Sequence, residues 1–168
     1  MIRCGVLTIS DRSSQGIRED RSGPLIQEIL TIAGYRIVCA EIIPDEFEMI
    51  RQILVDWCAT KDINLLLTTG GTGFAPRDIT PEATRSVVEK IVPGIPETMR
   101  HESMKKTPHA MLSRSVAGIL NKTLIINLPG SPKAVQENLD ILLPVLPHAI
   151  ELLVDETRSE TGHNYHQL

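Results

Sequence analysis

The most informative segment of the chain is Leu65-Leu66-Leu67-Thr68-Thr69-Gly70-Gly71-Thr72-Gly73. Its opening run of apolar residues, without polar alternation, is typical of a parallel strand that helices cover on both faces. The three glycines that follow allow a tight turn whose backbone N–H groups stay free to hold an anion. A glycine-rich turn that serves only close packing between a strand and a helix has the same pattern. The stretch therefore predicts a buried central strand, and its loop is a candidate ligand site.

Strands and helices alternate on both sides of this central strand. Apolar or β-branched runs predict strands at 4–9, 35–43 and 123–128, and apolar residues at helical spacing predict helices at 22–33, 46–59 and 132–142. Such alternation favours right-handed βαβ units. We therefore expect an α/β fold of three layers, in which a mostly parallel open sheet lies between two layers of helices.

The remaining parts of the chain are less regular. Residues 10–21 are polar and predict a long loop, and a helix is expected to begin at Thr80, with Thr80 as its cap. Short helices are expected near 97–105 and 110–118, where prolines and a glycine interrupt the pattern. Pro144 and Pro147 should split or kink the last helix. Residues 1–154 are thus expected to form a single domain, followed by a polar tail at 155–168.

The composition is that of an ordinary globular domain. The 168 residues are 42% hydrophobic and 23% charged, which excludes a disordered chain and a coiled coil. Because the 17 Lys and Arg residues are outnumbered by 21 Asp and Glu residues, no nucleic-acid partner is expected. The three cysteines lack CxxC spacing and are expected to be buried thiols of a reducing compartment. Since neither a signal peptide nor an apolar run of roughly 20 residues is present, a cytoplasmic protein without a membrane partner is expected.

Four polar loops follow the carboxyl ends of the predicted strands, at 10–13, at 44–46, at 69–73 together with Arg77-Asp78, and at 128–133. Ligands of open α/β sheets bind at that edge, so these loops are the place to expect chemistry. The glycine loop contains neither a Walker Gly-Lys-Ser/Thr nor a G-x-G-x-x-G pattern. The last loop is a second anion candidate, because it places the N–H groups of a helix N-terminus beside Lys133. A serine-capped helix with an exposed lysine is the alternative.

Asp45 and Asp78 are the carboxylates with the most bearing on chemistry, because each lies in a strand-end loop beside a candidate anion site. A bound phosphate repels a carboxylate unless a cation lies between them, and Mg²⁺ is commonly held by one or two carboxylates together with phosphate oxygens. The pair therefore indicates metal-assisted phosphoryl chemistry. In the structural alternative, Asp45 caps the second helix and Asp78 caps the turn before Thr80.

Five blocks of sequence occur in an informative order: Thr8-Ile9-Ser10-Asp11-Arg12, Thr69-Gly70-Gly71-Thr72-Gly73, Arg77-Asp78-Ile79-Thr80-Pro81-Glu82-Ala83, Leu112-Ser113-Arg114 and Leu128-Pro129-Gly130-Ser131-Pro132-Lys133-Ala134. In these blocks the chain resembles the molybdopterin adenylyltransferases of the MogA/MoaB type, which share their fold with the gephyrin G domain. The resemblance covers nearly the whole chain. It implies a homotrimer that transfers AMP from Mg·ATP to the terminal phosphate of molybdopterin and releases pyrophosphate. The product would then serve a molybdenum-insertion protein.

The same resemblance implies roles for individual residues. Asp45 and Asp78 are expected to be catalytic and to hold Mg²⁺. The residues expected to bind molybdopterin or the nucleotide are Ser10, Asp11, Thr69, Gly70, Gly71, Thr72, Gly73, Ser113, Pro129, Gly130, Ser131, Pro132 and Lys133. Some MoaB-type relatives lack the acidic pair, so a molybdopterin-binding carrier without catalysis is the alternative function. The choice between the MogA and MoaB branches, and between molybdenum and tungsten, stays open.

Overall fold

The computed structural model describes residues 1–154, and the predicted polar tail at 155–168 lies outside the described residues. Six strands form one sheet: β1 (Arg3–Ile9), β2 (Arg36–Ile43), β3 (Leu65–Thr69), β4 (Lys90–Ile91), β5 (Ala117–Leu120) and β6 (Thr123–Leu128). The helices are α1 (Asp11–Ser14), α2 (Ser22–Ile32), α3 (Phe47–Thr60), α4 (Thr80–Arg85), α5 (Gly94–Met104), the 3₁₀ turn η1 (Pro108–Leu112), α6 (Pro132–Leu142) and α7 (Leu146–Val154).

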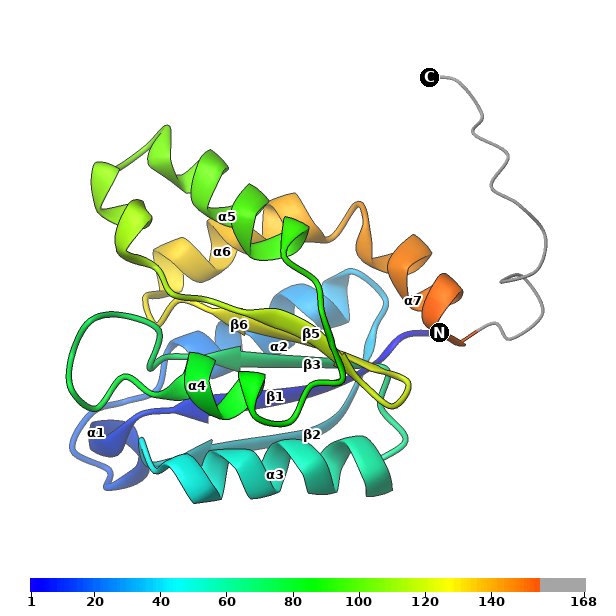
Figure 1. Cartoon of the computed structure of the whole chain (residues 1–168), viewed down its shortest axis with the longest axis horizontal. Coiled ribbons are helices and arrows are strands. Elements are labelled where there is room, and N and C mark those ends of the chain that lie inside the picture. The colour runs from blue at the N-terminus through cyan, green and yellow to red at the C-terminus, as the bar shows by residue number, and fades with distance from the viewer. Residues whose placement is uncertain (155–168) are drawn as a thin grey trace.

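The strands lie in the order β2-β1-β3-β6-β5-β4. The first four of these are parallel, whereas β5 runs antiparallel to β6 and β4 antiparallel to β5. Helices α2, α5, α6 and α7 cover one face of the sheet, and α3 and α4 cover the other (Figure 1). The predicted three-layer α/β fold with a mostly parallel sheet is therefore confirmed.

The central strand β3 explains why the fold has two cores. Leu65 and Leu67 point into the cluster formed with α2, α5, α6 and α7, while Leu66 points into the cluster formed with α3 and α4. All three side chains are fully buried. Side chains alternate between the two faces of a strand, so a continuous apolar run is what a strand covered on both sides requires.

Two expectations about local structure are wrong. Residues 11–14 form helix α1 inside the predicted loop, because Ser10 Oγ accepts a hydrogen bond from Ser13 N at 3.2 Å and caps the turn. No helix spans 110–118, since η1 ends at Leu112 and the chain continues into β5. That strand is held by antiparallel pairing with β6 through a tight turn at Asn121, which has a φ of 53°. The two-residue strand β4, which the sequence analysis does not anticipate, completes the edge of the sheet.

Other local expectations stand with small changes. The break between α6 and α7 contains Pro144, whereas Pro147 lies in the first turn of α7, and α5 begins three residues before the expected 97. Cys4 is buried, whereas Cys39 and Cys58 are half-buried, and all three are free thiols. Burial raises the pKa of the Cys4 thiol to about 12 and that of Cys58 to about 11. Within residues 1–154, no helix combines the length and apolar character needed to cross a membrane.

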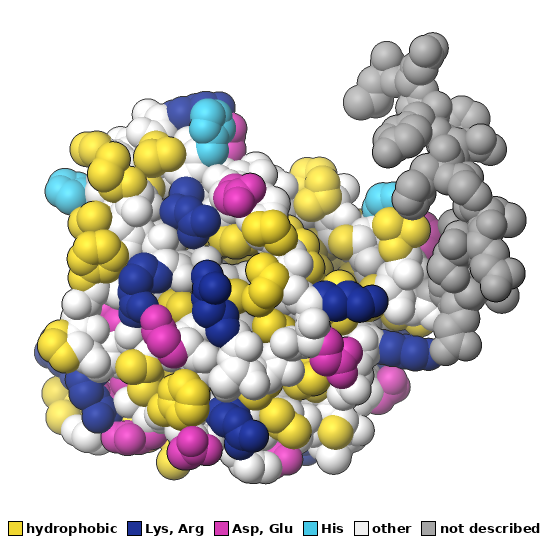
Figure 2. All heavy atoms as spheres, viewed as in Figure 1, with side chains coloured by type: hydrophobic (Ala, Val, Ile, Leu, Met, Phe, Trp, Pro, Cys, Tyr) yellow, Lys and Arg dark blue, Asp and Glu magenta, His cyan; other side chains and the backbone are white. Residues whose placement is uncertain are grey.

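The charges on the face shown in Figure 2 are mixed. Lys and Arg side chains alternate there with Asp, Glu and hydrophobic side chains, so no basic stripe covers this face. This distribution agrees with the formal net charge of -4.

Asn127 joins the strands that carry the candidate loops. Its side chain is fully buried in β6, and Nδ2 donates to the hydroxyls of Thr68 and Thr84 at 2.9 Å each. Its Oδ1 accepts from Val116 N at 3.2 Å. Asn127 thus ties β6 to β3, to α4 and to the segment before β5.

Asn127→Ala is expected to lower the free energy of unfolding by about 3 kcal/mol, because three buried polar groups lose their partner. Thermal unfolding followed by circular dichroism should show a fall in Tm of roughly 6 to 12 °C. Gln52→Ala is the matched control, because Gln52 has its amide on the exposed surface of α3, bonded to Asp56. A Tm for Asn127→Ala equal to that of the control would show that this network does not stabilise the sheet.

Candidate functional site

A polar cleft lies at the carboxyl ends of β1, β3 and β6. We call it the acidic cleft. Its volume is about 370 Å³, and its lining residues are Thr8, Ile9, Ser10, Ser13, Arg18, Glu19, Asp20, Arg21, Ser22, Asp45, Thr69, Gly70, Gly71, Asp78, Gly130, Ser131 and Pro132. Nine of the residues singled out from the sequence therefore line a single cavity, Asp45 and Asp78 among them.

A second cleft lies beside the first and is mainly apolar. We call it the apolar cleft. Its volume is about 300 Å³, and its lining residues are Thr72, Gly73, Met99, Arg100, Ser103, Thr107, His109, Ala110, Leu112, Ser113, Pro129, Ala134, Glu137 and Asn138. Oδ1 of Asn138 is buried there without a hydrogen-bond partner. An apolar lining with a few inward polar groups is typical of a pocket for a small organic ligand.

The glycine loop at 69–73 and the loop after β6 lie between the clefts, and we call these two backbone turns the ridge. Gly70 N donates to Leu128 O at 3.3 Å, and Thr69 Oγ1 donates to Pro129 O at 2.7 Å, so the glycine loop and the loop after β6 are joined. Gly70 and Gly71 have φ values of 99° and 63°. The N–H groups of Gly71, Thr72 and Gly73 donate no hydrogen bond within residues 1–154. The ridge therefore offers free donors to an anion bound beside it.

Thr80 has a different role from the one expected. Helix α4 begins at Thr80, and the Thr80 hydroxyl donates to Gly70 O at 3.0 Å instead of capping the helix. Thr80 N also donates to Gly71 O at 3.1 Å. These contacts reach nine and ten positions back to the glycine loop, which a local capping pattern does not reveal. Thr80 fixes the glycine turn in place.

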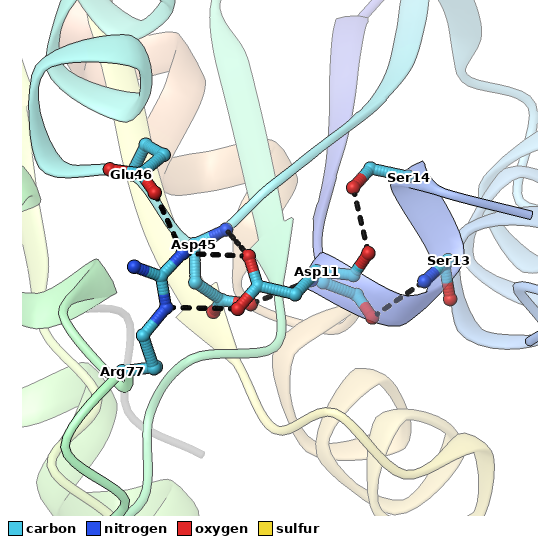
Figure 3. Close-up of polar contacts among 7 residues, drawn as sticks. Asp11, Ser13, Ser14, Asp45, Glu46 and Arg77 are labelled. Atoms are coloured by element: carbon cyan, nitrogen blue, oxygen red, sulfur yellow. Dashed lines mark hydrogen bonds and ion pairs between the residues drawn. The ribbon is translucent and has the colours of Figure 1, made fainter. Parts of the chain in front are cut away.

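Asp45 is held by its contact with Asp11. Asp11 N donates to Asp45 Oδ2 at 2.8 Å, and Asp45 N donates to Asp11 Oδ1 at 3.0 Å (Figure 3). Asp45 is 9% exposed. Burial raises the pKa of Asp45, and the charges of Asp11 and Asp78 raise it further, while the hydrogen bond from Asp11 lowers it. Asp45 does not cap α3, whose N-cap is Glu46 without a side-chain hydrogen bond.

The Asp11 carboxylate forms an ion pair with Arg77. Nε and Nη2 of Arg77 donate to the two oxygens of Asp11 at 2.9 and 2.8 Å, and Nη2 also donates to Glu46 at 2.8 Å (Figure 3). The bond from Arg77 lowers the pKa of Asp11, and the two carboxylates raise that of Arg77. Asp11 does not line either cleft. The structure therefore places Asp11 behind the acidic cleft, where it supports Asp45.

Asp78 sits at the end of the exposed segment after the glycine loop. Its Oδ2 accepts a hydrogen bond from Ala75 N at 2.9 Å, and its backbone N donates to Ala75 O at 2.9 Å. The carboxylate therefore closes a turn at 75–78, just before Thr80, as the structural alternative predicts. An added Cβ on Gly73 would lie 2.8 Å from Asp78 Oδ2, and one on Gly71 would lie 3.0 Å from Asp45 Oδ1. Each carboxylate thus lies against a glycine of the ridge.

The other predicted residues are distributed unevenly. Ser10 and Thr69, with Gly130, Ser131 and Pro132, line the acidic cleft, while Thr72, Gly73, Ser113 and Pro129 line the apolar cleft. Ser131 Oγ accepts from Ala134 N at 3.2 Å and caps α6. Lys133 is exposed and lines neither cleft. The start of α6 is therefore a serine-capped helix with an exposed lysine, which is the alternative to an anion site.

Asp20 is a residue of the acidic cleft that the sequence analysis missed. Its Oδ2 accepts from Thr8 Oγ1 at 2.7 Å, and its Oδ1 accepts from Ser22 N and Gly23 N at 3.0 Å each. An added Cβ on Gly23 would lie 2.4 Å from Asp20. The signal available in the sequence is an aspartate two residues before a helix, which is a common capping position.

Asp45→Asn is expected to raise the Tm at pH 7 by a few degrees, because it removes a buried charge that two neighbouring carboxylates repel. When folding raises the pKa of a carboxyl, the folded protein loses stability as the pH rises from the unfolded-state pKa through the folded-state pKa. The gain should therefore shrink when unfolding is measured near the ordinary carboxyl pKa of about 4. A Tm below that of the wild type at pH 7 would show that the charge stabilises the fold.

Comparisons with known proteins agree with the fold. The family model "Probable molybdopterin binding domain" matches residues 5–148. A molybdopterin adenylyltransferase from Helicobacter pylori is 48% identical over 155 residues, covering 91% of this chain and 88% of that protein. Gephyrin from Dictyostelium discoideum is 47% identical over 171 residues, covering 96% of this chain, which spans only 24% of gephyrin.

A solved structure has the same arrangement. The crystal structure of the molybdopterin biosynthesis enzyme MoaB from Thermus thermophilus superposes with a TM-score of 0.86 at 48% identity, covering 91% of this chain and 96% of that one. The resemblance inferred from the five sequence blocks is thereby confirmed. By sequence and by fold, this chain belongs to the family of probable molybdopterin binding domains.

Proposed function

We propose that this chain is a molybdopterin adenylyltransferase of molybdenum cofactor biosynthesis, which transfers AMP from Mg·ATP to the terminal phosphate of molybdopterin. The observation that carries the proposal is that Asp45 and Asp78 line one cleft beside the free amides of the ridge. A protein that only carried molybdopterin would need no pair of carboxylates next to an anion site. The relatives named adenylyltransferases, at 43 to 48% identity, support the same activity.

The acidic pair fits Mg²⁺. Oδ1 of Asp45 makes no hydrogen bond within residues 1–154, and the charges of Asp11 and Asp78 disfavour its ionised form. A cation between the carboxylates would relieve this repulsion. Among the described residues, no group of three or more His, Cys, Asp or Glu is arranged to hold a metal ion. Two carboxylates with bound phosphates are the usual ligands of Mg²⁺, which would neutralise phosphate charge during the transfer.

The two clefts suit the two substrates. We assign the triphosphate of ATP to the acidic cleft and the pterin to the apolar cleft, where Ser113 and the unpartnered Oδ1 of Asn138 can meet its polar edge. The phosphate of molybdopterin then reaches the ridge from one side and the α-phosphate of ATP from the other. Holding two anionic reactants in line is the main task in such a transfer.

The transfer is a displacement at phosphorus. An oxygen of the terminal phosphate of molybdopterin forms a bond to the α-phosphorus of ATP, and the bond from that phosphorus to the bridging oxygen breaks, so that pyrophosphate leaves with the electron pair. The free N–H groups of Gly71, Thr72 and Gly73 donate to the oxygens on which charge develops. Thr80 keeps these donors aligned by its bonds to Gly70 and Gly71.

The test is Mg²⁺-dependent formation of adenylylated molybdopterin and pyrophosphate from ATP and freshly prepared molybdopterin. We expect both products in equal amounts, and neither when EDTA is present. Tight binding of molybdopterin without product would instead indicate a carrier. We also propose that the protein is a homotrimer, and light scattering of the purified protein tests its mass. We place it in the reducing cytoplasm, where it would pass its product to a molybdenum-insertion protein.

A further inference from the structure

We propose that Arg114 is a positioning residue, which sets the place of the Asp78 carboxylate by joining the two ends of the segment 73–78. The inference rests on the proposed function, since it concerns the same reaction. Its basis is a group of contacts that one guanidinium makes with both ends of that segment and with α4.

Arg114 makes four contacts around this segment. Its backbone N donates to Thr72 O at 3.0 Å, and its Nε donates to Gly73 O at 2.7 Å. Nη2 donates to Asp78 O, and Nη1 pairs with the Glu82 carboxylate. The carbonyl groups at the start and at the end of the segment thus share one rigid, planar group of donors.

The segment between those ends depends on such anchoring. Residues 74–77 are exposed, and Phe74 is 69% exposed. On the outer side, Arg77 pairs with Asp11 and Glu46, which are themselves partly exposed. At the base, the guanidinium of Arg114 is 33% exposed and is the group that holds the backbone of Asp78. Movement at the base would displace the Asp78 carboxylate from the acidic cleft.

Arg114 also lies between the two clefts. The preceding residue, Ser113, lines the apolar cleft, as do Thr72 and Gly73, whose carbonyl groups Arg114 binds. Asp78, on the other side, lines the acidic cleft. The guanidinium therefore fixes the distance between the pterin side of the ridge and the acidic pair. A lysine has a single ammonium and lacks the planar fork needed to span both carbonyl groups.

Arg114→Gln and Arg114→Lys test this role. We expect kcat for adenylylation to fall about 10- to 100-fold, and the Mg²⁺ concentration for half-maximal rate to rise about 10-fold, as is usual when a group that orients a metal ligand is lost. Arg114→Lys should restore little of either value. Hydrogen exchange in the segment 73–78, at the bonded amides of Ala75 and Asp78, should become faster in both variants.

Arg3→Gln is the matched control. Arg3 is 34% exposed and also spans a turn, since its Nε donates to Asp62 O at 2.8 Å and its Nη2 pairs with Asp62 Oδ1 at 2.9 Å, at the other end of the sheet. We expect a similar loss of Tm, but wild-type kcat, Mg²⁺ dependence and exchange at 73–78. A loss of stability without a change in Mg²⁺ dependence in Arg114→Gln would reduce Arg114 to a structural residue and overturn the proposal.

The two proposals fail in different ways. If the wild type forms no adenylylated product, the proposed function fails, and the exchange measurement still decides whether Arg114 holds the segment. Unchanged exchange at 73–78 in Arg114→Gln overturns the positioning role in either case. If the wild type is active and both variants keep its kcat and Mg²⁺ dependence, only the role of Arg114 is lost.

Discussion

Asp78→Asn is expected to lower the rate of molybdopterin adenylylation by about a hundredfold or more, the usual cost of losing one charged group that stabilises a transition state. The amide has the shape of the carboxylate, and its oxygen can still accept the hydrogen bond from Ala75 N. The fold should therefore persist while the negative charge at the acidic cleft is lost. The measurement is the initial rate of pyrophosphate release at saturating ATP, molybdopterin and Mg²⁺.

The control for this experiment is Asp140→Asn. Asp140 is exposed on α6 and accepts a hydrogen bond from Gln136 at 2.9 Å, and it lines neither cleft. Both variants should unfold within a few degrees of the wild type. If Asp78→Asn released pyrophosphate as fast as Asp140→Asn, Asp78 would have no part in the reaction, and its carboxylate would serve only to close the turn at 75–78.

Gly70→Ala is expected to have the largest effect on stability, a loss of about 3 to 5 kcal/mol, because strain and steric overlap add at this residue. Gly70 has a φ of 99°, and an added Cβ would lie 2.2 Å from Ile9 O. Relief of that overlap requires the ridge to move away from β1. We therefore also expect adenylylation to be lost in the folded fraction, and the unfolding transition in urea measures the stability.

Two other glycines separate the cost of a positive φ from the cost of steric overlap. Gly16 has a φ of 71° with no atom within 4 Å of an added Cβ, so Gly16→Ala should cost only the backbone term of about 1 kcal/mol. Gly94 also has open space and lacks the positive φ, so Gly94→Ala should change stability by less than about 0.5 kcal/mol. Equal losses in Gly70→Ala and Gly16→Ala would show that contact with Ile9 has no energetic weight.

The architecture, and the edge of the sheet at which the candidate site lies, can be predicted from the amino-acid sequence. The apolar run of β3 needs burial on both faces, and alternating strand and helix patterns leave few topologies other than a mostly parallel sheet. Because the carboxyl ends of such strands meet at one edge, Asp45 and Asp78, 33 positions apart in the chain, could be placed together before the structure was known. These features depend on local periodicity and on chain topology.

The separate roles of the loops become visible only in the folded structure. The glycine loop contributes to both clefts. Asp11 is paired with Arg77, and Thr80 donates a hydrogen bond to Gly70 instead of capping α4. Likewise, β5 exists because residues 117–120 pair with β6. Each of these outcomes depends on contacts between residues distant in the sequence or on backbone pairing. Apart from the hairpin of β5 and β6, local spacing carries no information about such partners, because their hydrogen bonds exist only once the sheet has brought the loops together.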